Sequence, residues 1–185
     1  MSYAETLPPT ILNGKETLMK TIIVGIGNPL LGDDGVGWKV AEEIQRQLPP
    51  KTNIDVVCLS LGGLGLMERL IGYQRAILID AFALKENDEI GSILIMKLND
   101  LPNYSAYHTN NVSNISLQTA FELGRTMGAQ LPDDVDVVGI VTDQIHEFNE
   151  TLSPHVADAV PFAVRIVLDL LAQVPKHRNE YQVQK

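Results

Sequence analysis

Residues 21–40 read TIIVGIGNPLLGDDGVGWKV, and this stretch decides the fold class. It begins as a short apolar run, passes through a glycine-rich turn and continues as a helical pattern from Val36 to Leu48. A buried strand followed directly by a helix is typical of α/β proteins. The turn resembles a phosphate-binding loop, yet it carries Asp33 and Asp34, whose carboxylates repel phosphate. The two carboxylates therefore predict a positively charged ligand.

The same pattern recurs along the chain. Further Ile- and Val-rich runs are nearly continuous, which is typical of strands buried on both faces; they cover residues 54–60, 76–82, 92–98 and 135–141. Helical patterns alternate with them at 64–71, 115–127 and 156–171. Ser153 is the predicted cap of the last helix, with Pro154 at its first position.

This alternation predicts one α/β domain at residues 19–173. We expect a three-layer sandwich, with a mostly parallel, roughly five-stranded sheet, right-handed crossovers and flanking helices. Residues 1–18 are predicted to form a flexible extension, and residues 174–185 form a polar tail.

Composition narrows the functional classes. A hydrophobic fraction of 45% against 20% charged residues excludes wholesale disorder, and a formal charge of -9 disfavours a nucleic-acid partner. No window approaches the roughly 20 apolar residues of a membrane span. The single cysteine, Cys58, has no partner for an intramolecular disulfide. We therefore expect a soluble, cytoplasmic protein.

Three side chains form the candidate site. Asp34 follows the first predicted strand, Asp80 follows the third, and His108 lies in a polar loop after the fourth. Ligands of α/β sheets bind beyond the carboxyl ends of strands, so we expect these groups to converge on one edge. Carboxylate and imidazole ligands suit nickel or zinc, and three ligands leave positions for substrate or water.

Each candidate also has a structural interpretation. Asp33 or Asp34 would cap the helix that begins at Val36, and Asp80 would be a turn residue after its strand. His108 would be an ordinary surface histidine. Surface positions are also expected for the remaining histidines, which are His146, His155 and His177.

The turn does not fit a dinucleotide site. In GIGNPL the third glycine position holds Leu30, and Pro29 removes an N–H from the loop. Walker lysine, CxxC, HExxH and nucleophile-elbow patterns are absent from the sequence. We therefore expect no nicotinamide or flavin cofactor.

Three blocks of the chain resemble the [NiFe]-hydrogenase maturation endopeptidases. They read GIGNPLLGDDGVGWKVAEEI, ILIDAF and VVGIVTDQIHEFNETLSPHVADAVPFAV, and the resemblance runs from about Lys20 to Leu171. It implies a five-stranded phosphorylase/hydrolase-like α/β fold. It also implies removal of a short C-terminal peptide from a hydrogenase large-subunit precursor once nickel has been inserted.

The resemblance assigns the site residue by residue. Asp34 matches the metal-contacting acid of the first block, and Asp80 matches the aspartate after the third strand. The third ligand is a histidine in the loop before SLQTAFELG, where His108 is the histidine available; alignment without a gap instead puts Ser113 there. The implied metal is nickel supplied by the substrate, so that no tightly bound cofactor of the protein's own is expected. Asp34 or Asp33 would position or deprotonate water, and Asp33 is equally well explained as structural.

Other functions remain open at this stage. A peptidyl-tRNA hydrolase begins with a comparable GLGNPG turn, but the histidine–asparagine pair expected after it is absent. A non-catalytic, nickel-dependent checkpoint or chaperone would recognise the loaded large subunit without cutting it. A flavodoxin-like module would retain a coloured cofactor on purification.

Overall fold

The computed structural model describes residues 11–12, 15–16, 19–83, 89–101, 116–143 and 148–173. Its main sheet has five strands: β3 (Thr21–Ile26), β4 (Ile54–Leu59), β5 (Arg75–Ala83), β6 (Ile93–Lys97) and β7 (Asp134–Thr142). The four α-helices are α1 (Val36–Gln47), α2 (Gly63–Arg69), α3 (Leu117–Thr126) and α4 (Pro154–Ala172). There are also two short 3-10 helices among the described residues. η2 (Gly32–Gly35) precedes α1, and η3 (Leu98–Asp100) follows β6.

The strand order is β4-β3-β5-β7-β6, with only β6 antiparallel to its neighbour. This confirms the predicted mostly parallel five-stranded sheet. Within the predicted N-terminal extension, β1 (Ile11–Leu12) and β2 (Lys15–Glu16) form a separate antiparallel pair. The proposed flexibility of that extension stays a prediction.

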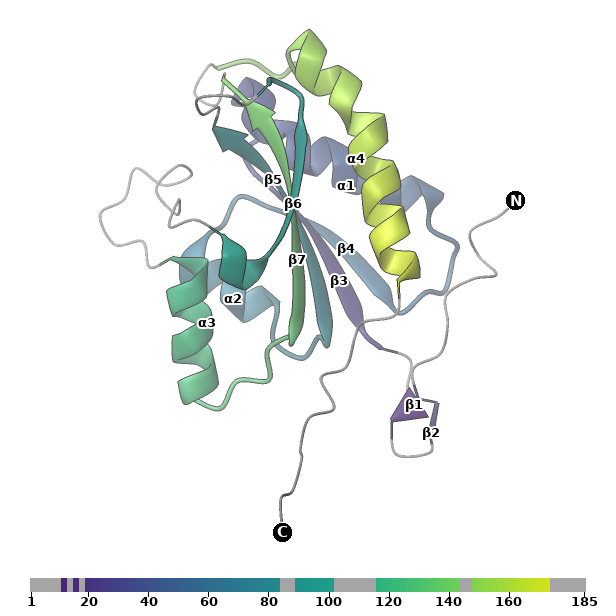
Figure 1. Cartoon of the computed structure of the whole chain (residues 1–185), viewed down its shortest axis with the longest axis vertical. Coiled ribbons are helices and arrows are strands. Elements are labelled where there is room, and N and C mark those ends of the chain that lie inside the picture. Colours follow the sequence, from purple (N-terminus) through teal and green to yellow (C-terminus); the bar gives the residue numbers. More distant parts are fainter. Residues whose placement is uncertain are drawn as a thin grey trace.

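Helices cover both faces of the sheet, as Figure 1 shows. Alternate residues of β3 point to opposite faces: Ile23 packs in the cluster built with α1 and α4, whereas Ile22 and Val24 pack in the cluster built with α2 and α3. This period of two buries both faces of the central strand. The predicted three-layer sandwich is therefore confirmed.

The two edge strands differ from the prediction that every apolar run is buried on both faces. All six residues of β4 are partly exposed, and Ile95 of β6 is 53% exposed. Their sequences are as apolar as those of central strands. Only the sheet order, which gives each of them a single neighbouring strand, distinguishes them.

An ionic network joins the amino-terminal ends of β5 and β7 to the end of α4. The Arg75 guanidinium is 4% exposed and donates to the carbonyl oxygens of Leu170 at 2.8 Å and Gln173 at 3.1 Å. It also pairs with Asp136 at 3.2 Å and Asp134 at 3.3 Å. These contacts add donors to carbonyl groups at the C-terminal end of α4, where Leu170 O also accepts from Gln173 N at 3.1 Å.

Lys97 of β6 closes this network from the surface. Its Nζ lies 2.6 Å from Asp134 and 2.5 Å from Asp136. Burial lowers the pKa of Lys97, but hydrogen bonds and Coulombic attraction from the two aspartates outweigh it, so that the pKa lies above its usual value. Lys97 therefore remains charged at neutral pH.

Candidate active site

In the glycine-rich turn after β3, backbone atoms occupy the space where side chains would otherwise lie. Gly27 has φ +129°, and a Cβ there would lie 1.8 Å from the Asp34 carbonyl oxygen. At the start of α1, a Cβ on Gly37 would lie 2.3 Å from Ile26 O and 2.4 Å from Ile79 O. Because no side chain fits at either position, the loop and α1 sit directly against the ends of β3 and β5. The turn fixes η2 and its two aspartates at the carboxyl edge of the sheet.

Asp33 is a structural residue of this turn. Its carboxylate is 1% exposed and accepts three hydrogen bonds: from Thr142 Oγ1 at 2.7 Å, Ser153 N at 2.6 Å and Ser153 Oγ at 2.7 Å. Thr142 ends β7 and Ser153 precedes α4, so Asp33 joins its turn to two segments that lie 109 and 120 residues away in sequence. Both carboxylate oxygens are engaged, which leaves Asp33 poorly suited to act on water.

The predicted helix-capping roles are wrong in detail. Gly35 is the residue before α1, and no side chain caps that helix. Ser153 does occupy the cap position of α4, followed by Pro154, but its hydroxyl donates to Asp33 and does not cap the helix. The hydroxyl is held by this hydrogen bond to a buried carboxylate, since charge-assisted hydrogen bonds are about twice as strong as neutral ones. Sequence patterns that mark caps carry no sign of this partner, which lies 120 residues away.

We expect Asp33→Asn to lower the free energy of unfolding by about 2 kcal/mol, because the amide presents N–H groups to donors that now meet a carboxylate. Urea unfolding followed by the fluorescence of Trp38, the single tryptophan, measures the change. Asp143→Asn, at an exposed position just after β7, is the matched control and should leave stability unchanged. Unaltered stability of Asp33→Asn would contradict the structural role.

Asp34 and Asp80 lie at the same edge of two neighbouring strands. Asp34 is 4% exposed, and its Oδ2 accepts from Asn28 N at 2.6 Å. Asp80 is half-buried, and its Oδ1 accepts from Ala81 N at 2.9 Å. The pairing of β3 with β5 ends at Gly25 and Ile79, so Asp80 lies one residue beyond it, next to the end of β3. Each carboxylate accepts a hydrogen bond from one backbone N–H. Carboxylate oxygens are also suitable ligands for cations.

Asp80 was expected to be a residue after its strand, and this is wrong. β5 continues to Ala83 because residues 80–83 pair with Gly139–Thr142 of β7. β5 therefore extends beyond its pairing with β3, and its last four residues pair with β7 alone. Asp80 is held by sheet pairing, which fixes its backbone more firmly than a turn does.

The third predicted ligand cannot be placed with these two. His108 and Ser113 lie outside the described residues, as do His146 and His177. Among the residues that the structure does describe, no group of three or more His, Cys, Asp or Glu side chains could hold a metal ion. Oxygen ligands from Asp34 and Asp80 suit a divalent cation chemically. The complete ligand set stays a prediction.

Cys58 and His155 take no part in the candidate site. Burial raises the pKa of the Cys58 thiol above its ordinary value, and the charge of Glu42 raises it further, so the thiol stays protonated at neutral pH. A protonated, half-buried thiol is a poor nucleophile. His155 is exposed on α4, as expected for a surface histidine.

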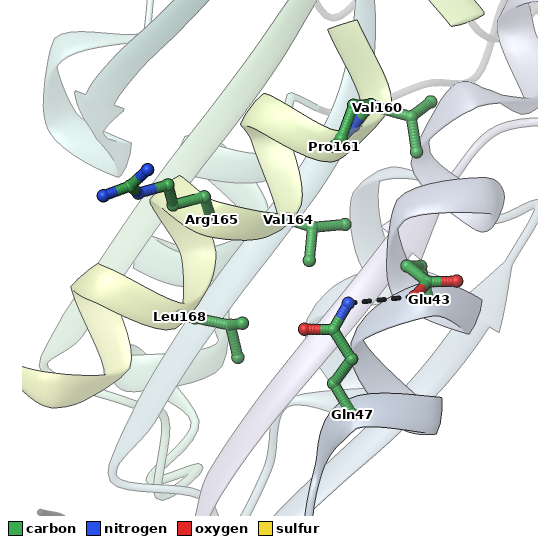
Figure 2. Close-up of a pocket in the computed structure, with 7 residues that line it drawn as sticks. All are labelled: Glu43, Gln47, Val160, Pro161, Val164, Arg165 and Leu168. Atoms are coloured by element: carbon green, nitrogen blue, oxygen red, sulfur yellow. Dashed lines mark hydrogen bonds between the residues drawn. The ribbon is translucent and has the colours of Figure 1, made fainter. Parts of the chain in front are cut away.

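A pocket of about 360 Å³ lies elsewhere, between α1 and α4 (Figure 2). Its apolar wall comes from α4, including Val160 and Val164, and its polar rim includes Glu43 and Gln47, which are hydrogen-bonded to each other at 2.9 Å. None of the candidate carboxylates lines it. It is therefore separate from the candidate active site.

Sequence reasoning missed the partners that hold the site. Asn28, whose N–H binds Asp34, was read only as part of the turn, and Thr142 was not singled out. Trp38 also supports the loop, because its Nε1 donates to Leu59 O at 3.3 Å and Gly27 N donates to the same oxygen at 3.1 Å. The position of Asn28 in the GIGNPL turn is the one local signal for these contacts, and no local pattern predicts those of Trp38 and Thr142.

No described helix is long and apolar enough to cross a membrane. Comparison with curated proteins finds a hydrogenase 2 maturation protease of Escherichia coli, 24% identical over 139 residues, which are 75% of this chain and 78% of that protein. A putative hydrogenase maturation protease of Methanocaldococcus jannaschii is 28% identical over 149 residues, covering 80% and 93% of the two chains.

Solved structures show the same fold. An endopeptidase from Escherichia coli superposes with a TM-score of 0.69 at 22% identity, covering 83% of this chain and 92% of that one. The hydrogenase maturating endopeptidase HybD from Escherichia coli gives a TM-score of 0.64 at 22% identity, with the same coverage. Residues 38–170 match the hydrogenase maturation protease (HycI) family, a span that includes Asp80 and begins just after η2. Because this match covers most of the chain, the protein belongs to the hydrogenase maturation protease family and is a peptide-bond hydrolase.

Proposed function

We propose that this protein removes the C-terminal extension of a [NiFe]-hydrogenase large-subunit precursor after nickel insertion, with the substrate-bound nickel as the recognition element. The observation that carries the proposal is the pair of carboxylates at one edge of the sheet, Asp34 behind β3 and Asp80 in β5. Family membership supplies the endopeptidase activity. The single cysteine, Cys58, supports the reducing cytoplasm as the setting.

The roles of the acidic residues follow from their contacts. Both oxygens of Asp33 are occupied by hydroxyl and amide donors, so Asp33 is assigned to structure. Asp34 and Asp80 are assigned to the substrate's nickel, together with His108 as the proposed third ligand. Because the substrate brings the metal, the enzyme needs no tightly bound ion of its own, and cleavage depends on a correctly loaded precursor.

Hydrolysis of the peptide bond requires a base and a proton for the leaving amine. The oxygen of a water molecule attacks the carbonyl carbon, Asp34 accepts a proton from that water, and the same proton passes to the departing nitrogen as the C–N bond breaks. The products are a carboxylic acid and an amine, so the atoms of one water are accounted for. Asn28 N holds Asp34 in place for this transfer.

The test compares a nickel-loaded precursor with the same precursor free of nickel. Each is incubated with the purified protein, and the products are weighed by intact mass. We expect loss of a C-terminal peptide only from the loaded precursor, because only it presents the cation that Asp34 and Asp80 contact. Equal cleavage of both forms would contradict recognition through nickel. Nickel-dependent binding with no cleavage would instead support a checkpoint role.

A further inference from the structure

Two exposed apolar residues lie on adjacent backbone segments beside the candidate active site. Leu31 and Asn149 form an isolated parallel bridge, in which Asn149 N donates to Leu30 O at 3.1 Å and Gly32 N donates to Asn149 O at 2.5 Å. These hydrogen bonds hold the backbone of the residue before each partner close to the bridge. These residues are Leu30, 44% exposed, and Phe148, 82% exposed. We call this pair the Leu30–Phe148 clasp.

Hydrogen bonds hold Leu30 and Asn149, the residue that follows Phe148. Asn28 Oδ1 accepts from Leu30 N at 3.1 Å, and Asn149 Oδ1 accepts from Thr151 N at 3.1 Å and from Thr151 Oγ1 at 2.8 Å. The fold gains little from the aromatic ring, since most of it faces solvent. An exposed aromatic residue on a fixed backbone is the usual form of an interaction anchor, because little freedom is lost on binding.

The position of the clasp identifies its occupant. Leu30 lies in the same turn as Asn28 and Asp34, so the clasp continues the edge on which the candidate carboxylates stand. The occupant that this position favours is a polypeptide whose scissile bond lies at that edge. Asp143 and Glu150, on either side of Phe148 in sequence, are exposed, and their charges disfavour an acidic segment.

We infer that the Leu30–Phe148 clasp binds the substrate polypeptide beside its scissile bond, by taking an apolar side chain of an extended, non-acidic segment between Leu30 and Phe148. This inference rests on the proposed function, because it takes the substrate to be a protein precursor. The clasp supplies affinity and register, while the carboxylates perform the chemistry. It therefore contributes to substrate binding more than to turnover.

The test uses a matched pair of exposed phenylalanines. Phe148→Ala removes the anchor, whereas Phe162→Ala removes a ring of α4 that is 66% exposed. For the nickel-loaded precursor we expect Phe148→Ala to raise Kd and KM by about tenfold and to change kcat less than twofold. Leu30→Ser should act in the same direction, Phe148→Leu should restore most of the affinity, and Phe162→Ala should match the unsubstituted protein.

Each outcome has a defined meaning. Cleavage with unchanged KM in Phe148→Ala would overturn the clasp and leave the proposed function intact. Binding that depends on Phe148 without any cleavage would overturn the proposed function and retain the clasp. A dimer that dissociates in Phe148→Ala, measured by sedimentation, would make a second copy the occupant and overturn the inference. Equal thermal unfolding of both alanine variants checks that neither result reflects misfolding.

Discussion

Asp34→Asn should reduce kcat for precursor cleavage by roughly 10²–10⁴-fold, the usual contribution of a positioned general base. The amide is nearly isosteric with the carboxylate and still offers an oxygen to Asn28 N, so the turn keeps its geometry. It cannot take a proton from water at neutral pH, and it carries no charge to attract a cation. Single-turnover cleavage of the nickel-loaded precursor, followed by intact mass, measures this loss.

Asp80→Asn should cause a loss of similar size if both carboxylates contact the same cation. The matched control is Asp158→Asn, at an exposed position on α4, which should cleave at the normal rate. Circular dichroism and urea unfolding establish that each variant folds. Full activity of Asp34→Asn, or an equal loss in Asp158→Asn, would show that the catalytic assignment is wrong.

Arg75→Met should lower the free energy of unfolding by about 3–5 kcal/mol, the usual cost of breaking a buried ion pair by removing one partner. The substitution keeps most of the side-chain volume, but it leaves Asp136, which is 3% exposed, without its buried cation. It also removes the donors to the last carbonyl groups of α4. Urea unfolding followed by Trp38 fluorescence measures the change.

Two further variants show whether the buried charge is the cause. Arg165→Met, at an exposed position of α4, should change stability by less than about 0.5 kcal/mol. The double variant Arg75→Met/Asp136→Leu should recover part of the loss, because it removes the more deeply buried of the two carboxylates that lose Arg75. A double variant that is no more stable than Arg75→Met would assign the loss to the helix-end hydrogen bonds.

The helices and strands could be predicted from the sequence because hydrophobic periodicity is a property of neighbouring residues. The apolar runs and the helical stripes predicted all five strands of the main sheet and all four α-helices, and the predicted alternation gave the sandwich. Edge and centre could not be told apart, since the run that forms β6 is as apolar as the one that forms β7. The antiparallel direction of β6 is likewise a property of sheet order and not of its residues.

The sequence alone determined that Asp34 follows a strand of the α/β sheet, because an apolar run and the turn after it are local patterns. That Asp80 lies within its strand was decided by the pairing of β5 with β7. Which aspartate of the GDD turn is structural was decided only by tertiary structure. Thr142 and Ser153 lie 109 and 120 residues from Asp33, and their donors reach its carboxylate through the packing of β7 and α4 against η2. A buried carboxylate is held by whichever donors the fold brings to it, and no local pattern contains that information.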